Sequence, residues 1–233
     1  MQESEFDEFA EEYDKTLGTS IAVSGEDPSY FYQYKVGVAA EVVRKKRVSV
    51  ARIFDFGSGV GNSVPFFVEW FPGAKLTCAD VSRHSLEVSA SRFPGAAEHL
   101  MISGQRLPCA DSVFDLVFSA CVFHHIAHAE HECWLAELRR VCRPGGLLTV
   151  FEHNPWNPLT LKVVRDCPFD RNAHLIAAPE FRRSLARSGW CEPKIINTLF
   201  FPRPLAFLRR VERLLHFVPL GAQYAAIATA PES

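Results

Sequence analysis

The sequence has no apolar run that approaches the roughly 20 residues a membrane span requires. Its first residues are acidic, without the basic segment and apolar stretch of a secretory signal. The sequence also has no large excess of charge of one sign, because it contains 25 basic and 27 acidic residues. These absences argue against a membrane-embedded or exported protein and give no reason to expect a nucleic acid as partner.

The seven cysteines form no Cys-x-x-Cys pair, and their number is odd. Several lie inside apolar runs, which is typical of reduced, mostly buried thiols. We therefore expect a cytoplasmic protein without a structural disulfide.

The segment His124–Cys133 is rich in histidine, but no HExxH base accompanies it and its spacing matches no closed structural metal site. The histidines and cysteine in question are His124, His125, His128, His131 and Cys133. We expect a solvated, histidine-rich helix entrance there and no bound metal.

No repeat, low-complexity tract or linker divides the chain, so we expect a single α/β domain over residues 1–233. Helical spacing predicts an N-terminal helical cap over 1–47. From about residue 50, strand patterns alternate with helical ones, which indicates a parallel sheet with helices on both faces. The cofactor-binding core would cover 50–153, and 154–233 would supply substrate-side helices and a final hairpin.

The predicted strands are 50–56, 74–81, 97–103, 112–123, 147–153, 194–201 and 223–230. Pro144, Gly145 and Gly146 would end the helix before the fifth strand. Between the last two strands, residues 202–219 have helical apolar spacing and several arginines. We expect this basic amphipathic segment to cover the sheet edge or the cleft, with contact to a membrane surface as the less favoured alternative.

Three glycines, Gly57, Gly59 and Gly61, alternate directly behind the first predicted strand. At that end of an open α/β sheet ligands bind, and free amides with the helix dipole favour an anionic group. Glycine also permits positive φ angles and a close approach of main chain to a ligand. A ligand with a carboxylate or phosphate is therefore expected at this loop.

Two cofactor classes fit such a loop. Dinucleotide enzymes use GxGxxG, whereas here the spacing is GxGxG followed by Asn62. Asp80, at the end of the next strand, could accept both ribose hydroxyls of an adenosine in either class. The glycine spacing and Asp55, two residues before the first glycine, argue against the dinucleotide class.

Four segments occur in order along the chain: IFDFGSGVGN, LTCADVS, LPCADSVFDLVFSACVFHHI and LRRVCRPGGLLTVFEH. Together they resemble class I S-adenosylmethionine (SAM)-dependent methyltransferases, in the small-molecule branch that includes quinone-biosynthesis methyltransferases. The resemblance covers about residues 50–153 and extends to FDEFAEEYD, which is similar to the lid helix of that branch. It implies a Rossmann-like three-layer sandwich, with a seven-stranded, mostly parallel sheet whose last strand is antiparallel.

The resemblance also implies S-adenosyl-L-methionine as cofactor and a set of residues that bind it. These are Asp55, Gly57, Gly59, Gly61, Asn62, Asp80, Val81, Ser103, Gly104, Gln105, Ser119 and Ala120. The glycines would approach the methionine part, Asp80 the ribose, Val81 the adenine, and Asp55 would support the loop and the amino group. Where the family often has an acid followed by alanine on the adenine side, this chain has Ser103 and Gly104.

Methyl transfer is an in-line displacement on a methyl that the cofactor already activates, and a base is needed where the acceptor is a hydroxyl or an ammonium. His124 and His125 follow the fourth predicted strand and His153 follows the fifth, so these imidazoles are candidate bases. The alternative for the paired histidines is packing at a helix start.

Three further residues are candidate substrate contacts. Glu152 and Asn154 lie beside His153 at the predicted cofactor mouth, although the two Asn-Pro pairs there could serve only as a rigid turn. Tyr13 falls in the segment that resembles the lid helix.

The sequence thus predicts a cytoplasmic SAM-dependent methyltransferase that acts on an oxygen, nitrogen or carbon atom of a small molecule, with its oligomeric state open. One alternative is an NAD(P)-dependent oxidoreductase on a Rossmann sheet. The other is a non-catalytic partner protein that binds SAM.

Overall fold

The computed structural model describes residues 13–232, and within them the side chains from residue 17 onward apart from that of Phe169. Its helices are α2 (Tyr13–Ser20), α3 (Pro28–Lys46), α4 (Val64–Trp70), α5 (Arg83–Arg92), α6 (His131–Val141), α7 (Pro158–Asp166) and α8 (Ala178–Arg187). Short 3₁₀ helices are η1 (Ala22–Ser24), η2 (Phe123–His125), η3 (His128–Glu130) and η4 (Pro168–Asp170), and a longer one is η5 (Arg203–Leu215). The strands are β1 (Arg52–Phe56), β2 (Lys75–Asp80), β3 (Glu98–Met101), β4 (Phe114–Ala120), β5 (Cys142–His153), β6 (Cys191–Thr198) and β7 (Gln223–Thr229).

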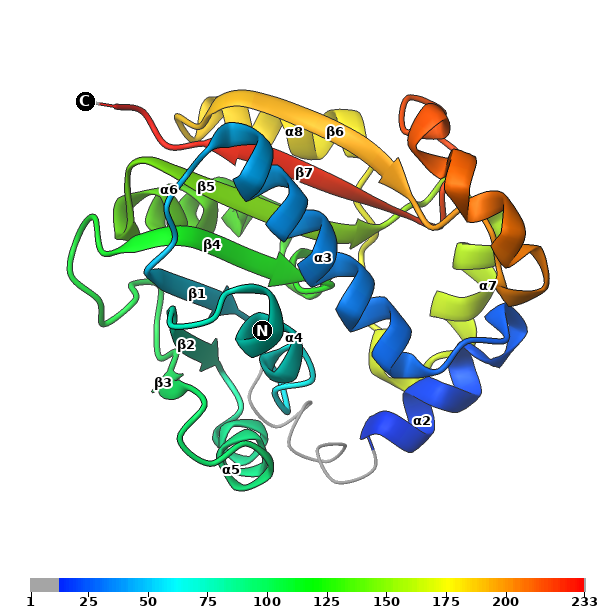
Figure 1. Ribbon diagram of the computed structural model, residues 1–233, viewed down its shortest axis with the longest axis horizontal. Coiled ribbons are helices and arrows are strands. Elements are labelled where there is room, and N and C mark those ends of the chain that lie inside the picture. Colours follow the sequence, from blue (N-terminus) through cyan, green and yellow to red (C-terminus); the bar gives the residue numbers. More distant parts are fainter. Residues whose placement is uncertain (1–12, 233) are drawn as a thin grey trace.

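The strands form one seven-stranded sheet in the order β3-β2-β1-β4-β5-β7-β6. The first five pair in parallel, whereas β7 runs antiparallel to both β5 and β6. The carboxyl ends of β1, β4 and β5 point to one side of the molecule, where α2, α7 and η5 gather (Figure 1). The predicted fold, a mostly parallel sheet of seven strands with an antiparallel last strand, is confirmed.

Apolar side chains on both faces of the sheet build two cores. Along β1, Ile53 packs with residues of α3 and α4 on one face, and Phe54 packs with residues of α6 and α8 on the other. The same alternation continues at Leu116 and Val117 on β4, because successive side chains of a strand point to opposite faces. The resulting three layers are visible in Figure 1, where α3 crosses in front of the sheet and α6 and α8 lie behind it.

Polar caps fix the starts of the two helices that flank the carboxyl edge of the sheet. The Asp27 carboxylate accepts a hydrogen bond of 2.9 Å from the Ser29 amide, and Pro28 occupies the first turn of α3. The Asn157 side chain accepts from the amides of Leu159 and Thr160 at the start of α7. Both helices thereby present fixed faces toward that edge.

The structure differs from the sequence prediction at the start of the fifth strand. β5 begins at Cys142, and Gly145 and Gly146 lie within it. Hydrogen bonds to Ala230 hold them there, with Gly145 donating its amide and Gly146 accepting at its carbonyl. Since pairing with Ala230 satisfies these groups and Gly145 adopts a φ of +71°, the Pro-Gly-Gly motif forms a β-bulge in the strand instead of a loop before it.

The helical spacing predicted between the last two strands corresponds to η5, a 3₁₀ helix with a kink at Leu205. One smaller expectation is also corrected. The cysteines are all free thiols, but only Cys78, Cys142 and Cys167 are buried. Within residues 13–232, none of the helices is both long and apolar enough to cross a membrane.

Candidate active site

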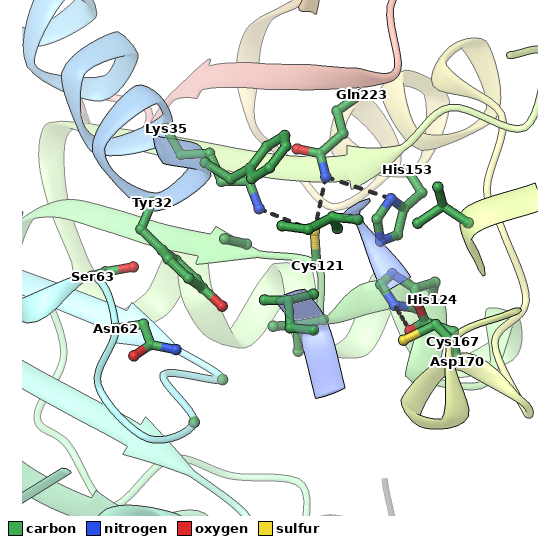
Figure 2. Close-up of a pocket in the computed structure, with 18 of the residues that line it drawn as sticks. Tyr32, Lys35, Asn62, Ser63, Cys121, His124, His153, Cys167, Asp170 and Gln223 are labelled. Carbon is green, nitrogen blue, oxygen red and sulfur yellow. Dashed lines mark hydrogen bonds and ion pairs between the residues drawn. The ribbon is translucent and has the colours of Figure 1, made fainter. Parts of the chain in front are cut away.

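A cavity of about 220 Å³ lies at the carboxyl edge of the sheet, between the glycine loop and the helices that surround it. One side, here called the loop wall, consists of Asp55, Gly57, Ser58, Gly59, Val60, Asn62, Ser63 and Asp80. The opposite side, the polar wall, consists of Lys35, Cys121, His124, His125, His153, Asp170 and Gln223. Figure 2 shows several of these side chains gathered around the same space.

The glycines of the loop wall adopt backbone conformations that other residues rarely reach. Gly57 and Gly59 have φ angles of +74° and +52°. A Cβ atom on Gly57 would lie 2.4 Å from Val122, whereas one on Gly59 would meet no atom within 4 Å. Gly57 therefore permits close packing of the loop on the chain after β4, and Gly59 leaves main chain bare toward the cavity.

Two carboxylates lie beside this loop, and one of them holds it through hydrogen bonds. Asp80 accepts hydrogen bonds from the amides of Gly59, at 2.8 Å, and Ser82, at 2.9 Å. Asp55 is 3% exposed, and its Oδ2 atom has no hydrogen-bond partner. Burial, with a smaller contribution from Asp80 and against the effect of Lys35, raises the pKa of Asp55 to about 8. A buried, unsatisfied carboxyl at a cavity wall is a group suited to a cationic ligand.

On the polar wall, Cys121 holds the central position. Its φ of +60° is unusual for a residue other than glycine, and its amide donates to the Phe151 carbonyl at 2.8 Å. This conformation directs Sγ into the cavity, where it accepts hydrogen bonds from Lys35 Nζ at 3.2 Å and Gln223 Nε2 at 3.5 Å (Figure 2). Lys35 is 4% exposed, so a buried lysine faces a partly buried thiol.

The charges around Cys121 favour a thiolate. Burial alone would raise the pKa of the thiol, but Lys35 and His153 outweigh it and lower the pKa to about 6. For His153 the effect is the reverse: burial would lower the pKa of the ring, and Cys121 raises it. Cys121 and His153 therefore form a thiolate–imidazolium pair with Lys35 beside it.

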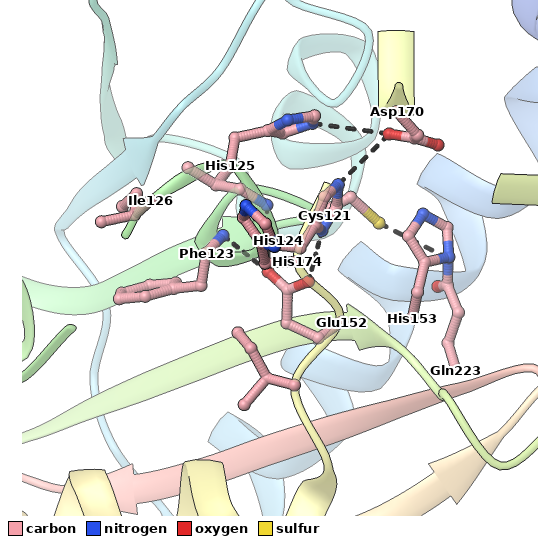
Figure 3. A network of polar contacts seen from close by, with 12 residues as sticks. Cys121, Phe123, His124, His125, Ile126, Glu152, His153, Asp170, His174 and Gln223 are labelled. Atoms are coloured by element: carbon pink, nitrogen blue, oxygen red, sulfur yellow. Dashed lines mark hydrogen bonds and ion pairs between the residues drawn. The ribbon is translucent and has the colours of Figure 1, made fainter. Parts of the chain in front are cut away.

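A second polar cluster adjoins the first. Glu152 is 1% exposed and accepts from the amides of Val122 and Phe123 and from His124 Nδ1, the last at 2.6 Å (Figure 3). The other ring nitrogen of His124, Nε2, lies 3.3 Å from Asp170 Oδ1. Burial opposes a charge on this ring, yet Glu152 and Asp170 raise its pKa to about 10. His124 thus holds its proton at neutral pH and is poorly suited to act as a base.

His125 has a different environment. Burial lowers its pKa although Asp170 opposes the change, so the ring is neutral. Its Nε2 atom lies 3.5 Å from Asp170 Oδ1, and its ring centroid lies 4.1 Å from that of His124. The two histidines and Asp170 therefore converge on one point at the cavity wall.

Comparisons with known proteins show which family of enzymes this chain resembles. A family model described as a methyltransferase domain matches residues 54–150, from β1 into β5. The chain is 28% identical over 180 residues to a malonyl-[acyl-carrier protein] O-methyltransferase of Geobacter sulfurreducens, which covers 72% of this chain and 67% of the relative. Residues 54–150 therefore match a methyltransferase domain, and the chain is similar to class I S-adenosylmethionine-dependent methyltransferases.

Other similar proteins agree with this assignment. A ubiquinone/menaquinone biosynthesis C-methyltransferase of Burkholderia mallei is 28% identical over 113 residues. The match covers 46% of this chain and 46% of that relative, so the chain spans less than half of the relative's length. Among solved structures, a possible histamine N-methyltransferase from Thermotoga maritima superposes with a TM-score of 0.68 at 20% identity. That match covers 98% of this chain and 99% of the other, and it shows the shared fold.

Half of the predicted cofactor-binding residues line the cavity: Asp55, Gly57, Gly59, Asn62, Asp80 and Ala120. The other half do not line it: Gly61, Val81, Ser103, Gly104, Gln105 and Ser119. Gly61 instead packs against α5, since a Cβ atom there would lie 2.2 Å from Ser89 Oγ. Ser119 is fully buried within β4.

The predicted bases His124, His125 and His153 all line the cavity, whereas the predicted substrate contacts Glu152 and Asn154 do not. Glu152 lies behind His124, and Asn154 uses its amide to bind the carbonyls of Pro219 and Gly221 before β7.

Two further predictions concern the lid-like segment that contains Tyr13 and the histidine-rich segment His124–Cys133. Tyr13 begins α2, but its side chain lies outside the described residues, as does most of the segment that resembles the lid helix. The histidine-rich segment is less solvated than expected, because His131 is buried and donates through Nε2 to the carbonyls of Phe123 and Ile126.

Sequence reasoning missed four members of the polar wall: Lys35, Cys121, Asp170 and Gln223. Cys121 could have been found, because it directly follows Ala120 at the end of the fourth predicted strand. Lys35 is a lone cation in an otherwise apolar and aromatic part of its helix, which is a weaker signal. For Asp170 and Gln223 the sequence offers no signal, because they reach the cavity through the fold alone.

Proposed function

We propose that this protein transfers the methyl group of SAM, bound on the loop wall, to a small molecule held against the polar wall. The observation that carries the proposal is one cavity bounded on one side by bare main chain and two carboxylates and on the other by ionisable side chains. We also propose a cytoplasmic location, which the seven free cysteines support.

The loop wall suits the groups that SAM carries. Asp55 offers an unpaired carboxyl oxygen for the ammonium of the methionine part, and the bare main chain at Gly59 permits close approach. Asp80 presents a carboxylate, an acceptor group that suits ribose hydroxyls, at the cavity lining. When bound, the cofactor supplies an electrophilic methyl group, and the chain has only to position the acceptor and manage its proton.

The rest of the cavity suits an acceptor with an apolar body. Its remaining lining includes Leu17, Ile21, Phe31, Leu159 and Val163, contributed by α2, α3, α7 and the chain after α2. The polar atom of the acceptor would then lie at the polar wall, with its apolar part under these side chains. Such a molecule fits the chemical range of the small-molecule methyltransferases that resemble this chain.

Cys121 is the proton acceptor that this arrangement favours. Its thiolate projects into the cavity and has a pKa near neutral pH, where proton transfer to a base is most effective. His124 and His153 carry protons, and His125 directs Nε2 toward Asp170. We therefore assign Lys35 and His153 the role of holding Cys121 in its ionised form.

Transfer of label from methyl-labelled SAM tests the proposal. The purified protein is incubated with a small-molecule extract, and products that gain one labelled methyl are identified by mass spectrometry. We expect at least one labelled product, together with a higher melting temperature in S-adenosylhomocysteine (SAH). Cofactor binding without label in any product would support a non-catalytic SAM-binding protein, and stabilisation by NAD(P) alone would support an oxidoreductase.

A further inference from the structure

His124, His125 and Asp170 bring three metal-ligating atoms to one point of the cavity wall. His124 Nε2 and His125 Nε2 lie 3.3 Å and 3.5 Å from the same oxygen, Asp170 Oδ1. One ligand atom of each residue lies within 4.8 Å of the others. The two histidines come from η2 and the carboxylate from η4, so separate parts of the fold converge here (Figure 3).

These separations suit a single ion. Nitrogen and oxygen ligands bind Zn²⁺ at about 2.1 Å, and two ligands at a tetrahedral angle are then about 3.4 Å apart. The two separations from Asp170 Oδ1 are of this size. Two imidazoles and one carboxylate form a donor set of first-row divalent metals, and three protein ligands leave room for a ligand from outside.

Glu152 supplies the orienting contact that metal-binding histidines usually have. It accepts the Nδ1 proton of His124 at 2.6 Å, which fixes Nδ1 as the donor and directs Nε2 toward Asp170. Glu152 is itself held by the amides of Val122 and Phe123. The histidine therefore cannot rotate away without breaking its contacts with both Glu152 and Asp170.

The point of convergence is also accessible from the cavity. All three residues line the space that Cys121 and the loop wall also line. Asp170 and His125 are 11% and 9% exposed at their side chains, whereas His124 is at 1%. An ion held here would have its remaining coordination positions directed at the space proposed for the acceptor.

We propose that one divalent transition-metal ion of the Zn²⁺ type displaces the proton that His124 Nε2 donates to Asp170, binds to His124, His125 and Asp170, and coordinates the oxygen of a hydroxyl-bearing methyl acceptor. The acceptor part rests on the proposed function, whereas the ion site stands on the geometry of the three ligands. It departs from the sequence-based expectation that this segment holds no metal.

The ion would define the acceptor chemistry. A hydroxyl bound to a divalent cation loses its proton far more readily than a free one, and Cys121 Sγ is the base proposed to receive it. The oxygen lone pair then forms the O–C bond to the methyl group as the C–S bond breaks, and its electron pair remains on sulfur. SAH and the methyl ether or ester result, with no oxidant or reductant consumed.

Calorimetric titration of chelator-treated protein with ZnCl₂ tests the site. We expect one equivalent bound per chain, and an affinity at least about tenfold lower in His125→Ala and in Asp170→Asn. Two matched variants should bind Zn²⁺ as the wild type does. Asp166→Asn removes an exposed carboxylate just before η4, and His128→Ala removes one ring of an exposed pair with His174.

Three results would overturn the site: no binding to the wild type, binding unchanged in both ligand variants, or binding lost only in His128→Ala. A Co²⁺ derivative then tests the open positions, since acetohydroxamate should shift its visible absorption, and an unchanged spectrum would refute the acceptor role. SAH binding by the same samples verifies folding of each variant. Failure of SAH binding with intact Zn²⁺ binding would contradict the proposed donor site and leave the ion site standing.

Discussion

The two walls of the cavity differ in whether main chain or side chains form them. The loop wall is largely main chain, with glycines at positive φ and two carboxylates, within Asp55–Asp80. The polar wall is entirely side chain, and its members come from α3, η2, η4, β5, β7 and the chain after β4. A wall of main chain binds through shape and fixed dipoles, whereas a wall of thiol, imidazole and ammonium groups can hold and move protons.

This contrast suggests a division of labour. Substitutions in the loop wall should change cofactor affinity, and substitutions in the polar wall should change the rate of transfer at constant cofactor affinity. Measurements that separate binding from turnover can therefore test the comparison directly.

The largest expected effect is on Asp80. In Asp80→Ala we expect the affinity for SAH to fall about 200-fold or more, because charge-assisted hydrogen bonds contribute about 1.5–3 kcal/mol each and two are lost. Calorimetric titration measures the change. Glu87→Ala, an exposed carboxylate on α5, is the matched control and should bind normally. Equal affinities for the Asp80 and Glu87 variants would refute a ribose contact at Asp80.

The next effect concerns turnover. In Cys121→Ser we expect the rate of methyl transfer to fall about 100-fold, because a hydroxyl is a far poorer proton acceptor than a thiolate and general bases contribute about that much. SAH affinity should stay within twofold of the wild type. Cys133→Ser, at an exposed position on α6, should retain full activity. A Cys121→Ser variant that loses cofactor binding instead would break the division between the walls.

The loop wall was accessible to sequence reasoning because its parts are close in the chain and obey local rules. Gly57 and Gly59 follow a strand pattern directly, and Asp80 ends the next strand, so strand-end topology alone places them together. The strand patterns along the chain also located each of the seven strands of the sheet. The start of β5 was wrong because long-range bonds to Ala230 decide the conformation of Gly145 and Gly146.

The polar wall was only partly accessible, because its contacts span large sequence separations. Lys35 and Cys121 are 86 positions apart, and His124 and Asp170 are 46 apart. The three predicted histidines were found through the ends of their strands, but their charge states depend on these distant partners. Chemistry that depends on such pairs needs the fold before it can be inferred.

A smaller effect should reveal the charge on Asp55. Its raised pKa of about 8 means that the free protein holds this carboxyl protonated at pH 6.5, whereas a bound ammonium requires the carboxylate. SAH affinity should therefore rise about tenfold from pH 6.5 to 8, with the slope of one proton released on binding. Adenosine, which lacks the amino acid part, should bind with no such slope. A slope that persists in Asp55→Asn would assign the proton to another group.

The smallest expected effect tests the polar wall by the reactivity of its thiol. Alkylation of Cys121 by iodoacetamide, followed by peptide mass spectrometry, should show a midpoint near pH 6, since Lys35 and His153 outweigh burial there. In Lys35→Met the midpoint should rise by about one pH unit, because the cation that favours the thiolate is removed. Lys46→Met, at the exposed end of the same helix, should leave it unchanged. An unchanged midpoint in Lys35→Met would mean that the imidazolium of His153 alone sustains the thiolate, and the role assigned to Lys35 would then be wrong.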